Sequence, residues 1–436
     1  MNLYRLLQER AADKPVRVGL IGAGKFGSMF LSQVPSTPGL EVVAIADLDT
    51  DRARTACHTV GWLQSHIDAT VFLTDGMELV NRDDVDVVIE ATGHPAAGIQ
   101  HALAAIEAGR HIVMVNVEAD VLAGPLLAQK AREQGVVYSM AYGDQPALTS
   151  EIVDWARAAG LEVVAAGKGT KYLPAYHQVT PDDVWSHYGL SAQEAAAAGM
   201  NPQMFNSFLD GTKSAIEMAA IANACDLAVP DAGLAFPPCG VDDLAHIMRP
   251  QSLGGVLPQS GVVEVVSSLE RDGRPVYRDL RWGVYVVFKA PNNYAAACFR
   301  QYGLPTDSTG QYAAMYKPFH LIGLELGISV LSAALRGEPT GQTRAWVGDV
   351  AAVAKRDLKA GETLDGEGGY TVWGQLVSAR RSAAEHLLPI GLAHGVSLKN
   401  DVPRGQAVTL ADVSLPNNQA VQIRQEMVST CKSAVN

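Results

Sequence analysis

The chain has 436 residues, of which 48% are hydrophobic and 18% charged, and its formal net charge is -12. This length exceeds one ordinary hydrophobic core, so two or three domains are expected. The composition is that of a folded globular protein, not of a disordered or fibrous one. The acidic balance and the lack of any Lys/Arg run argue against a nucleic-acid partner.

The cysteines and the first residues bear on cellular location. The five cysteines are scattered and never spaced as C-x-x-C, so neither a disulfide framework nor a thiolate zinc site is indicated. The opening segment MNLYRLLQERAADKP interrupts its leucines with charges, unlike a signal peptide. No stretch approaches the ~20 apolar residues of a membrane span. We expect a cytoplasmic protein without a membrane partner.

Short apolar runs alternate with helical stretches over residues 16–141. Strands that are apolar on both faces and separated by helices are typical of a doubly wound parallel sheet. This pattern predicts an α/β fold with a Rossmann dinucleotide-binding domain over residues 1–145. An α+β domain for substrate binding and dimerisation is predicted over residues 146–340, and the protein is expected to be a homo-oligomer.

The first apolar run leads into a glycine motif, VRVGLIGAGKFGSMF. Gly22, Gly24 and Gly27 have G-x-G-x-x-G spacing, and Lys25 and Phe26 lie between them. The first glycine permits a tight turn, the second lets the backbone approach a pyrophosphate, and the third allows close helix packing. The motif predicts that NAD or NADP binds at these five residues.

Asp47 closes the next apolar run, about 20 residues further on, where a carboxylate can accept hydrogen bonds from both ribose hydroxyls. A carboxylate there favours NAD because it would repel a 2′-phosphate. Arg52 and Arg54 follow closely and keep NADP open. The alternative for Asp47 is an N-cap of the helix predicted in TDRARTAC.

The later strand ends should also meet the coenzyme, because ligands of such sheets lie beyond the carboxyl ends of the strands. Thr92 and Gly93 of EATGHP and Asn116 of VNVEAD are predicted on the nicotinamide side, although a simple turn would also explain Gly93. Glu118 and Asp144, the latter in YGDQPA, are candidate catalytic groups. Asp144 would equally serve as the N-cap of the helix that follows.

The segment GKGTKYLP places Lys168 and Lys171 among glycines directly after an apolar run. An anionic group of a substrate would give both lysines a partner, and the glycine N–H groups could add donors. Both lysines are therefore candidate catalytic residues. A solvated turn is the alternative.

The segment LDGTKSAIEMA spaces Asp210, Lys213 and Glu217 at i, i+3 and i+7, which is one helical face if the segment is helical throughout. Lys213 is a further catalytic candidate. Asp210 and Glu217, with Asp144, could bind Mg²⁺ or Mn²⁺ through oxygens. The alternative is a solvated face with local ion pairs.

The segment MYKPFH adds Lys317 and His320. His320 is included among the candidate site residues, although a lone histidine near a helix start is more often structural.

The tail contains a weak internal repeat. KRDLKAGETL from Lys355 and KNDVPRGQAV from Lys399 both read K-x-D-[LV]-x-x-G-x-x-[LV], and a turn glycine between two short strands explains each copy. Residues 341–436 resemble the SAF (antifreeze-like, β-clip) domain family. They are predicted to form a small β-rich accessory or assembly domain without catalytic groups, so substitutions at Lys355 or Lys399 are expected to leave turnover within severalfold.

The order of the motifs resembles the homoserine-dehydrogenase-like oxidoreductases with a C-terminal SAF domain. Within that group the chain looks like the 1-deoxy-D-xylulose-5-phosphate reductoisomerase-like enzymes of a divergent route into isoprenoid precursors. The same group contains the D-apionate oxidoisomerases of sugar-acid catabolism. The resemblance implies hydride transfer coupled to rearrangement of the carbon skeleton of a small anionic polyhydroxylated substrate, a sugar phosphate or sugar acid.

Two departures from homoserine dehydrogenases stand against simple homoserine oxidation, which remains an alternative. Val117 follows Asn116 where those enzymes carry an Asn-Lys pair, and Lys213 follows Gly211-Thr212 where they carry Ser or Asn. A non-catalytic nucleotide-sensing or assembly protein is the other alternative, suggested by the SAF-like tail. The many ionisable groups at predicted strand ends weigh against it.

Overall fold

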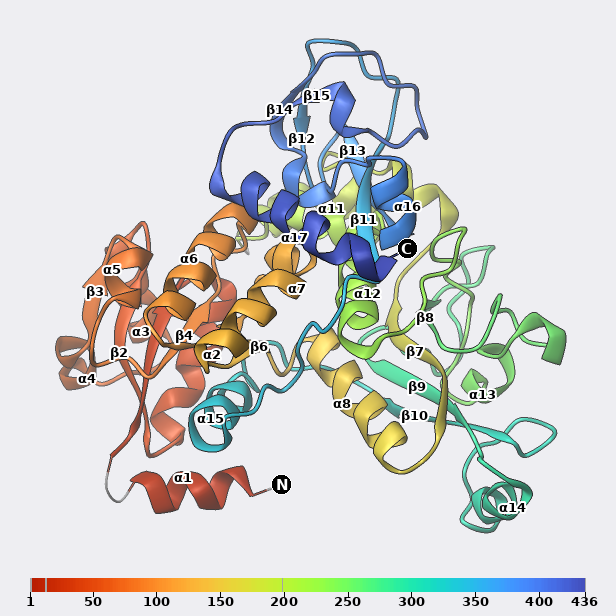
Figure 1. The fold of residues 1–436 in the computed structure, drawn as a ribbon, viewed down its shortest axis with the longest axis horizontal. Helices are drawn as coiled ribbons and strands as arrows, with labels where there is room; N and C mark the ends of the chain where they lie inside the picture. Colours follow the sequence, from red (N-terminus) through yellow and green to blue (C-terminus); the bar gives the residue numbers. More distant parts are fainter. Residues whose placement is uncertain (1, 12–13, 198, 436) are drawn as a thin grey trace. The chain divides into compact units, whose positions relative to one another are not determined.

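The computed structural model describes residues 2–11, 14–197 and 199–435 (Figure 1). The chain divides into two compact units, each assembled from segments that are distant in sequence. Unit 1 contains Met1–Glu151, His320–Arg344 and Gln422–Met427, and unit 2 contains Ile152–Phe319, Ala345–Val421 and Val428–Asn436. None of the described helices combines the length and apolar character needed to cross a membrane.

Unit 1 is built on a six-stranded sheet with the order β3-β2-β1-β4-β5-β6, and all of its pairings are parallel. Its strands are β1 (Val16–Ile21), β2 (Leu40–Ala46), β3 (Val71–Leu73), β4 (Val87–Glu90), β5 (His111–Met114) and β6 (Tyr138–Met140). The order reverses between β1 and β4, which confirms the predicted doubly wound Rossmann sheet. β3 is a three-residue strand that was not among the apolar runs marked in the sequence.

Unit 1 also contains helices, most of which connect successive strands of the sheet. They are α1 (Leu3–Ala11), α2 (Lys25–Gln33), α3 (Thr50–Thr59), α4 (Gln64–Ala69), α5 (Gly76–Val80), α6 (Pro95–Glu107), α7 (Val117–Gln134) and, much later in the chain, α15 (Gly327–Arg336). The bounds of α7 follow from its caps: the side chain of Asn116 accepts a hydrogen bond from the N–H of Ala119, and Gly135 ends the helix in the left-handed region at φ 73°.

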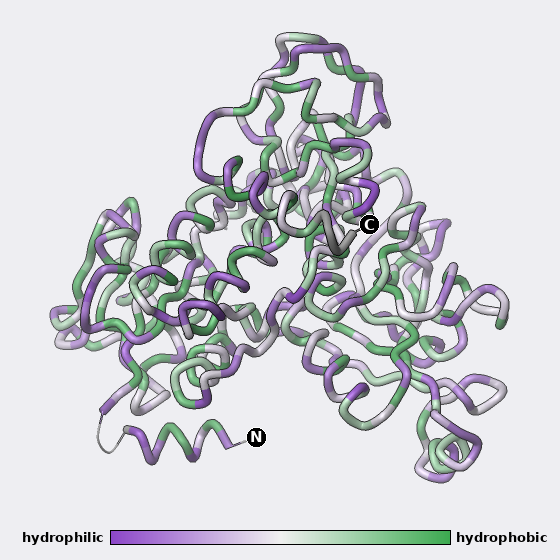
Figure 2. The backbone as a smooth tube through the Cα atoms, in the orientation of Figure 1, coloured by the Kyte–Doolittle hydropathy of each residue, from purple (hydrophilic) through white to green (hydrophobic). Residues whose placement is uncertain are grey.

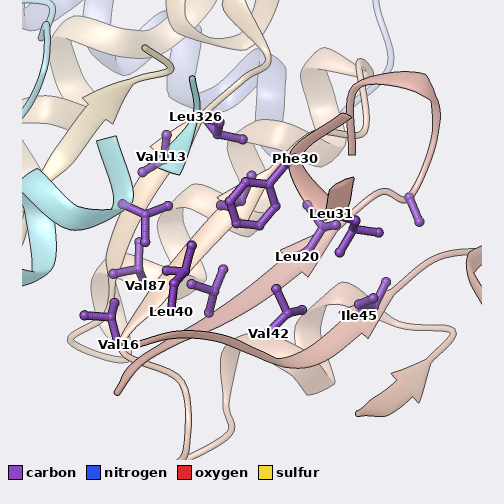
Figure 3. Close-up of a cluster of buried hydrophobic side chains, with 14 of the residues drawn as sticks. Val16, Leu20, Phe30, Leu31, Leu40, Val42, Ile45, Val87, Val113 and Leu326 are labelled. Atoms are coloured by element: carbon purple, nitrogen blue, oxygen red, sulfur yellow. The ribbon is translucent and has the colours of Figure 1, made fainter. Parts of the chain in front are cut away.

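One apolar cluster of unit 1 lies between the sheet and helices α1, α2, α3 and α15. Figure 3 shows Leu20 of β1, Phe30 of α2 and Leu326, which precedes α15, within this cluster. Hydrophobic and hydrophilic stretches alternate along the backbone (Figure 2), as expected when buried strands alternate with half-exposed helices. The return of residues 320–344 to this core was not apparent from the sequence.

Unit 2 contains a mixed four-stranded sheet with the order β10-β9-β7-β8. Its strands are β7 (Glu162–Thr170), β8 (Val262–Ser267), β9 (Val284–Lys289) and β10 (Tyr312–Lys317). The helices before residue 340 are α9 (Val184–Tyr188), α10 (Ala192–Ala197), α11 (Pro202–Leu209), α12 (Thr212–Cys225), α13 (Leu244–Ile247) and α14 (Asn293–Gln301), and α8 (Gln145–Ala158) begins in unit 1 and ends in unit 2. Helix α12 is buried along nearly its whole length and packs on β7 and β8. The predicted α+β character is thus present.

The tail is rich in short strands, and residues 345–421 group with unit 2. Its elements are β11 (Gly348–Ala354), β12 (Thr363–Asp365), β13 (Val372–Ser378), α16 (Ala379–Ala384), β14 (His394–Leu398), β15 (Val413–Ser414) and α17 (Gln419–Val435). β11 pairs with β13, and β12, β14 and β15 form a three-stranded sheet. A separate third domain, and its assignment to the SAF family, stay predictions.

The two copies of the tail repeat pair with each other. Leu358 and Val402 exchange both backbone hydrogen bonds, with N–O distances of 2.9 and 3.0 Å. Around this pair, the N–H of Gly361 donates to Leu398 and the N–H of Gly405 donates to Ala354, both at 2.8 Å. Residues 361 and 405 are equivalent positions of the repeat, and so are residues 354 and 398. Each copy therefore makes the same hydrogen bonds to the other, and the two copies are related by approximate two-fold symmetry. Both glycines have positive φ, which confirms the predicted turns.

Candidate functional site

The glycine loop between β1 and α2 has the three properties that the motif predicts. Gly22 has φ 96°, and a Cβ atom there would lie 2.6 Å from the carbonyl oxygen of Ala91. A Cβ atom on Gly27 would lie 2.4 Å from the carbonyl oxygen of Gly22. A Cβ atom on Gly24, the N-cap of α2, would meet nothing within 4 Å. The first and third glycines are therefore required by packing, and the second borders open space at a helix N-terminus, where a pyrophosphate is favoured.

Asp47 follows β2 directly, and its side chain is only 3% exposed. Its carboxylate accepts hydrogen bonds from the N–H groups of Ala23, at 2.9 Å, and Asp49, at 3.0 Å, and it pairs with Arg52 at 2.5 Å. The N-cap of α3 is Asp49, which accepts from the N–H of Arg52, so the alternative role of Asp47 as a helix cap is wrong. Asp47 thus connects the glycine loop to the end of β2. Because the cationic Arg52 lies beside this carboxylate, the site is compatible with the 2′-phosphate of NADP as well as with NAD.

A buried carboxyl group that sequence reasoning missed lies at the end of β4. Glu90 is fully buried, and its Oε1 accepts from the hydroxyl of Thr92 and contacts Nδ1 of His101 at 3.3 Å. Its Oε2 has no hydrogen-bond partner within the described residues. Thr92, which the sequence placed at the coenzyme, is therefore held by Glu90. The position of Glu90 at a strand end was the available signal.

Gly93 and Asn116 remain candidates for the nicotinamide side. Gly93 has φ 69°, and a Cβ atom there would meet nothing within 4 Å. Asn116 is 2% exposed; its side-chain oxygen caps α7, and its Nδ2 has no partner in the described part of the chain. A buried amide N–H without an acceptor is costly, so Asn116 can supply a donor to a bound group.

Asp144 and Glu118 lie at helix starts. Asp144 is 4% exposed, precedes α8 and accepts a hydrogen bond from the N–H of Gln145 at 2.8 Å. With the buried Asp120 it lines a small cavity of about 10 Å³, the size needed for about one water molecule. Burial raises the pKa of Asp120 to about 6, against the hydrogen bonds from Thr343 and Tyr138. Glu118 lies half-buried in the first turn of α7.

The glycines of GKGTKYLP serve strand packing in unit 2. Cβ atoms on Gly167 and Gly169 would each lie 1.9 Å from a carbonyl oxygen, that of Glu264 and that of Leu280 respectively. The N–H of Gly169 donates to Gly283 at 3.0 Å. The prediction that this N–H helps to bind an anion is therefore wrong, because the sheet already uses it.

The two lysines of this segment have different surroundings. Lys168 is buried in β7 and forms an ion pair with Glu217 of α12, with side chains 6% and 5% exposed. Lys171, half-buried just beyond β7, donates to the carbonyl of His187 and lies 5.8 Å from the ring centre of Tyr188. The solvated-turn alternative is wrong for Lys168. The two ammonium groups bind different partners within unit 2.

The predicted helical face of Asp210, Lys213 and Glu217 is wrong. Helix α12 begins at Thr212, and Gly211 before it has φ 91°, so Asp210 lies outside the helix. Asp210 pairs with Lys355 at 2.8 Å. Lys213 lies half-buried in the first turn of α12.

The predicted metal-binding set of Asp144, Asp210 and Glu217 receives no support. Asp210 and Glu217 are each paired with a different lysine, so their charges are already compensated. Across residues 2–11, 14–197 and 199–435, no group of three or more His, Cys, Asp or Glu side chains is arranged to hold a metal ion.

A hydrogen-bonded pair missed by sequence reasoning lies beside Asp210. Nδ1 of His177 is 2.6 Å from the carbonyl oxygen of Asp210, so it must donate, and Nε2 then accepts from the hydroxyl of Tyr172 at 2.9 Å. Burial lowers the pKa of His177, which keeps the imidazole neutral near pH 7. The ring stacks on Trp373, with centres 3.9 Å apart. No spacing in the sequence indicated this pair.

The two residues of MYKPFH belong to different units. Lys317 is the last residue of β10 in unit 2, whereas His320 opens the segment that returns to unit 1. His320 is half-buried and lies several residues before α15, which starts at Gly327. It is therefore not at a helix start.

Two family models match the chain. Residues 22–140 match the homoserine dehydrogenase NAD-binding domain, and residues 143–326 match the catalytic domain of oxidoreductase DRL. The Rossmann topology and the open glycine loop agree with the first match. Both matches are to domains of oxidoreductases, the first an NAD-binding domain and the second a catalytic domain. Residues after 326 lie outside both matches.

Curated relatives are similar over part of their length. A homoserine dehydrogenase of Neisseria gonorrhoeae is 32% identical over 133 residues, which are 28% of this chain and 28% of that protein. A 1-deoxy-D-xylulose 5-phosphate reductoisomerase of Heliobacterium modesticaldum is 29% identical over 194 residues, 42% of this chain and 44% of that one. The chain thus spans less than half the length of these two relatives. A solved homoserine dehydrogenase from Thiobacillus denitrificans is 14% identical, with a TM-score of 0.43 over 80% of this chain and 84% of that one.

Proposed function

We propose that the protein couples NAD(P)-linked hydride transfer to rearrangement of the carbon skeleton of an anionic polyhydroxylated substrate, as a 1-deoxy-D-xylulose-5-phosphate reductoisomerase-like enzyme. The observation that carries the proposal is the glycine loop, which has open space at Gly24 and donates a hydrogen bond to Asp47 from the N–H of Ala23. The residues that follow this domain, 143–326, match the DRL catalytic domain. The partial similarity to a reductoisomerase supports the coupled rearrangement.

The residues of the coenzyme site fit a dinucleotide. Its pyrophosphate would lie against the loop from Gly22 to Gly27, which includes Lys25 and Phe26, and its adenosine ribose would lie at Asp47. The nicotinamide side would meet Thr92, Gly93 and Asn116. When bound, the coenzyme supplies or accepts the hydride. The chain contributes the donors and the space that position it.

The substrate side is proposed to use ionisable groups for binding and proton transfer. They are Lys171, Lys213, Glu118, Asp144 and His320, whereas Lys168 is already neutralised by Glu217. Tyr172 and His177 are added to this set. The hydroxyl of Tyr172 donates to the neutral imidazole of His177, and this pair can hold a proton near the substrate. A homo-oligomer located in the cytoplasm is part of the proposal.

Two other functions of the same class remain candidates. Oxidation of homoserine or another amino or hydroxy acid without isomerisation is favoured by the match of residues 22–140 to the homoserine dehydrogenase coenzyme domain. Conversion of D-apionate would use the same coenzyme site on a sugar acid. A nucleotide-sensing protein without catalysis would bind coenzyme and turn over none of these compounds.

The test is an NAD(P)-linked activity screen of the full chain against deoxyxylulose phosphate, apionate and homoserine, each with and without Mg²⁺ or Mn²⁺. NMR of the product distinguishes a rearranged skeleton from simple oxidation. We expect turnover of a sugar phosphate with rearrangement. Oxidation of homoserine without rearrangement would favour the plain dehydrogenase, and coenzyme binding without any turnover would favour the sensing protein.

A further inference from the structure

Two cationic side chains meet at the carboxyl end of β7. Lys171 follows the last residue of that strand, and Arg281 lies in the segment before β9. A Cβ atom on Gly169 would lie 1.9 Å from the carbonyl oxygen of Leu280 and 2.9 Å from the backbone nitrogen of Arg281. The missing side chain at Gly169 therefore lets the segment carrying Arg281 lie directly against β7, next to Lys171.

Both cations lie against the same aromatic ring. The Lys171 ammonium is 5.8 Å and the Arg281 guanidinium 6.0 Å from the ring centre of Tyr188. The guanidinium also lies 4.6 Å from the ring centre of Trp282. Cations are attracted to such ring faces, so the aromatic side chains hold the two charges in place without neutralising them.

Neither cation has a carboxylate partner in the part of the chain that the structure describes. The ammonium of Lys171 donates to a neutral acceptor, the carbonyl of His187, and Arg281 makes only the two ring contacts through its side chain. Burial and the neighbouring charge of Arg281 both lower the pKa of Lys171. Two like charges in a half-buried place repel each other, and a bound anion would remove that cost.

An uncharged donor, the hydroxyl of Tyr176, lies near Arg281: burial raises the pKa of Tyr176, and the nearby charge of Arg281 acts in the opposite direction. Among the described residues, the hydroxyl of Tyr176 has no hydrogen-bond partner, and its ring centre lies 5.0 Å from that of His187. Burial, followed by the charge of Lys171, lowers the pKa of His187, whereas Asp183 acts in the opposite direction.

The carboxylates of this region already have partners. Asp183 accepts from the hydroxyl of Thr180. Asp210, whose charge acts on Tyr188, is paired with Lys355. The charge of Lys171 and Arg281 is therefore left for a ligand.

We propose that Lys171, Arg281 and Tyr176 bind the oxyanion of a ligand, a phosphoryl or a carboxylate group. A guanidinium binds either group through two parallel hydrogen bonds, and an ammonium adds a charged donor. Lys168 is not part of this site because Glu217 neutralises it. The further step, that this oxyanion belongs to the substrate, rests on the proposed function.

The site is tested by direct binding of inorganic phosphate and of acetate to the full chain, measured by titration calorimetry and by broadening of the ³¹P resonance of phosphate. The variants are Arg281→Gln, Arg281→Lys, Lys171→Met and Tyr176→Phe. Arg274→Gln is the matched control, because Arg274 is an exposed arginine of the same unit that already pairs with Asp272. Unfolding midpoints show whether each variant is folded.

We expect Arg281→Gln and Lys171→Met to weaken binding of the preferred anion about 10- to 100-fold, the value of a lost charge-assisted hydrogen bond. Arg281→Lys should lose less, because it keeps the charge but not the paired donors, and Arg274→Gln should bind as the wild type does. Preference for phosphate assigns a phosphate ester, and preference for acetate assigns a sugar acid. Equal binding by wild type, Arg281→Gln and Lys171→Met, or no binding of either anion to the wild type, would overturn the proposal.

The same variants separate this inference from the proposed function. Anion binding is measured without turnover, so a failed activity screen leaves the binding result standing. If the wild type turns over a sugar phosphate and folded Arg281→Gln has an unchanged KM and kcat, the assignment of the oxyanion to the substrate is wrong and the proposed function stands. If phosphate binding depends on Arg281 but no compound is turned over, the site stands and the proposed function fails.

Discussion

Lys168 of β7 and Glu217 of α12 form an ion pair in which both side chains are almost completely buried. The pair joins the glycine-rich strand to the most buried helix of unit 2. Removing both charges from water costs about as much as their attraction gains, but leaving one of them alone is strongly unfavourable. The pair therefore sets a clear expectation for single and double variants.

We expect Lys168→Met and Glu217→Gln each to lower the free energy of unfolding by about 3–5 kcal/mol, because each leaves a buried charge without a partner. The double variant Lys168→Met/Glu217→Gln should lose much less than the sum of the two single losses. Urea denaturation of the four proteins measures the coupling. Additive losses would show that the two groups do not interact in solution.

The second prediction separates two glycines of the coenzyme loop. Gly24→Val should leave the unfolding midpoint close to that of the wild type and abolish binding of NAD and NADP, because its side chain enters open space where the pyrophosphate approaches. Gly27→Val should instead destabilise the fold, since its Cβ atom would lie 2.4 Å from the carbonyl oxygen of Gly22. Thermal unfolding and coenzyme fluorescence titration measure both effects. A destabilised Gly24→Val variant would mean that the space at this glycine is filled by protein.

The third prediction concerns the choice of coenzyme. Asp47→Ser removes the carboxylate at the predicted ribose position and frees Arg52 from its ion pair. NAD affinity should fall more than NADP affinity, because Arg52 can then meet a 2′-phosphate. The ratio of the two dissociation constants is the measurement, and it cancels any general loss from the hydrogen bond to Ala23. An unchanged ratio in a folded variant would remove Asp47 from the coenzyme site.

The sequence predicted the parts of the fold that depend on local pattern. The Rossmann sheet follows from alternating apolar runs and helices, and the glycine motif follows from backbone requirements at Gly22 and Gly27. The helical face of Asp210 and Glu217 was predicted wrongly because Gly211, in the left-handed region, starts the helix later than the spacing assumed. A single glycine has many conformations open to it, and only the packed structure selects one.

Pairings between distant segments had no sequence signal. Asp210 meets Lys355, and Lys171 lies beside Arg281, more than a hundred residues later in the chain. Such pairs depend on which strands become neighbours. The backbone of Leu280 packs directly against Gly169. The sequence shows the glycine, but it does not indicate that Leu280 is the residue packed against it. For the same reason sequence reasoning assigned Lys168 to a ligand and the structure assigns it to Glu217.

The fourth prediction is a pH dependence of stability. Burial raises the pKa of Glu264 to about 7 and that of Asp120 to about 6, above their ordinary values of 4.5 and 3.8. Between roughly pH 4 and 7 the folded chain thus binds more protons at these groups than the unfolded chain does, so their contribution to stability is present at low pH and lost as the pH rises.

The difference between wild type and Glu264→Gln isolates one of these groups. The variant keeps an oxygen acceptor for the N–H groups of Ala235 and Val265 but cannot ionise. Relative to wild type it should gain on the order of 3 kcal/mol of stability between pH 5 and pH 8. Glu9→Gln, on an exposed helix, should show no such change. Parallel pH profiles of wild type and Glu264→Gln would contradict the raised pKa.

The last prediction uses the repeat of the tail as its own control. Lys355 and Lys399 occupy the same position of the two copies, yet Lys399 is exposed and Lys355 is buried. The ammonium of Lys355 pairs with Asp210 at 2.8 Å and donates to the carbonyls of Val179 and Gly369. Lys355 thus has a structural role within unit 2, and the expectation that substitutions at either lysine leave turnover within severalfold stays a prediction.

Lys355→Met should lower the free energy of unfolding by about 3–5 kcal/mol, because Asp210 and two carbonyls lose their buried donor. Lys399→Met, at the exposed equivalent position, should change it by less than about 0.5 kcal/mol. The double variant Lys355→Met/Asp210→Asn should recover part of the loss, which distinguishes an unpaired charge from poor packing of the methionine. Urea denaturation measures all three. If Lys355→Met is as stable as Lys399→Met, the ion pair between Lys355 and Asp210 does not stabilise the packing of the segment after β11 against the residues between α11 and α12.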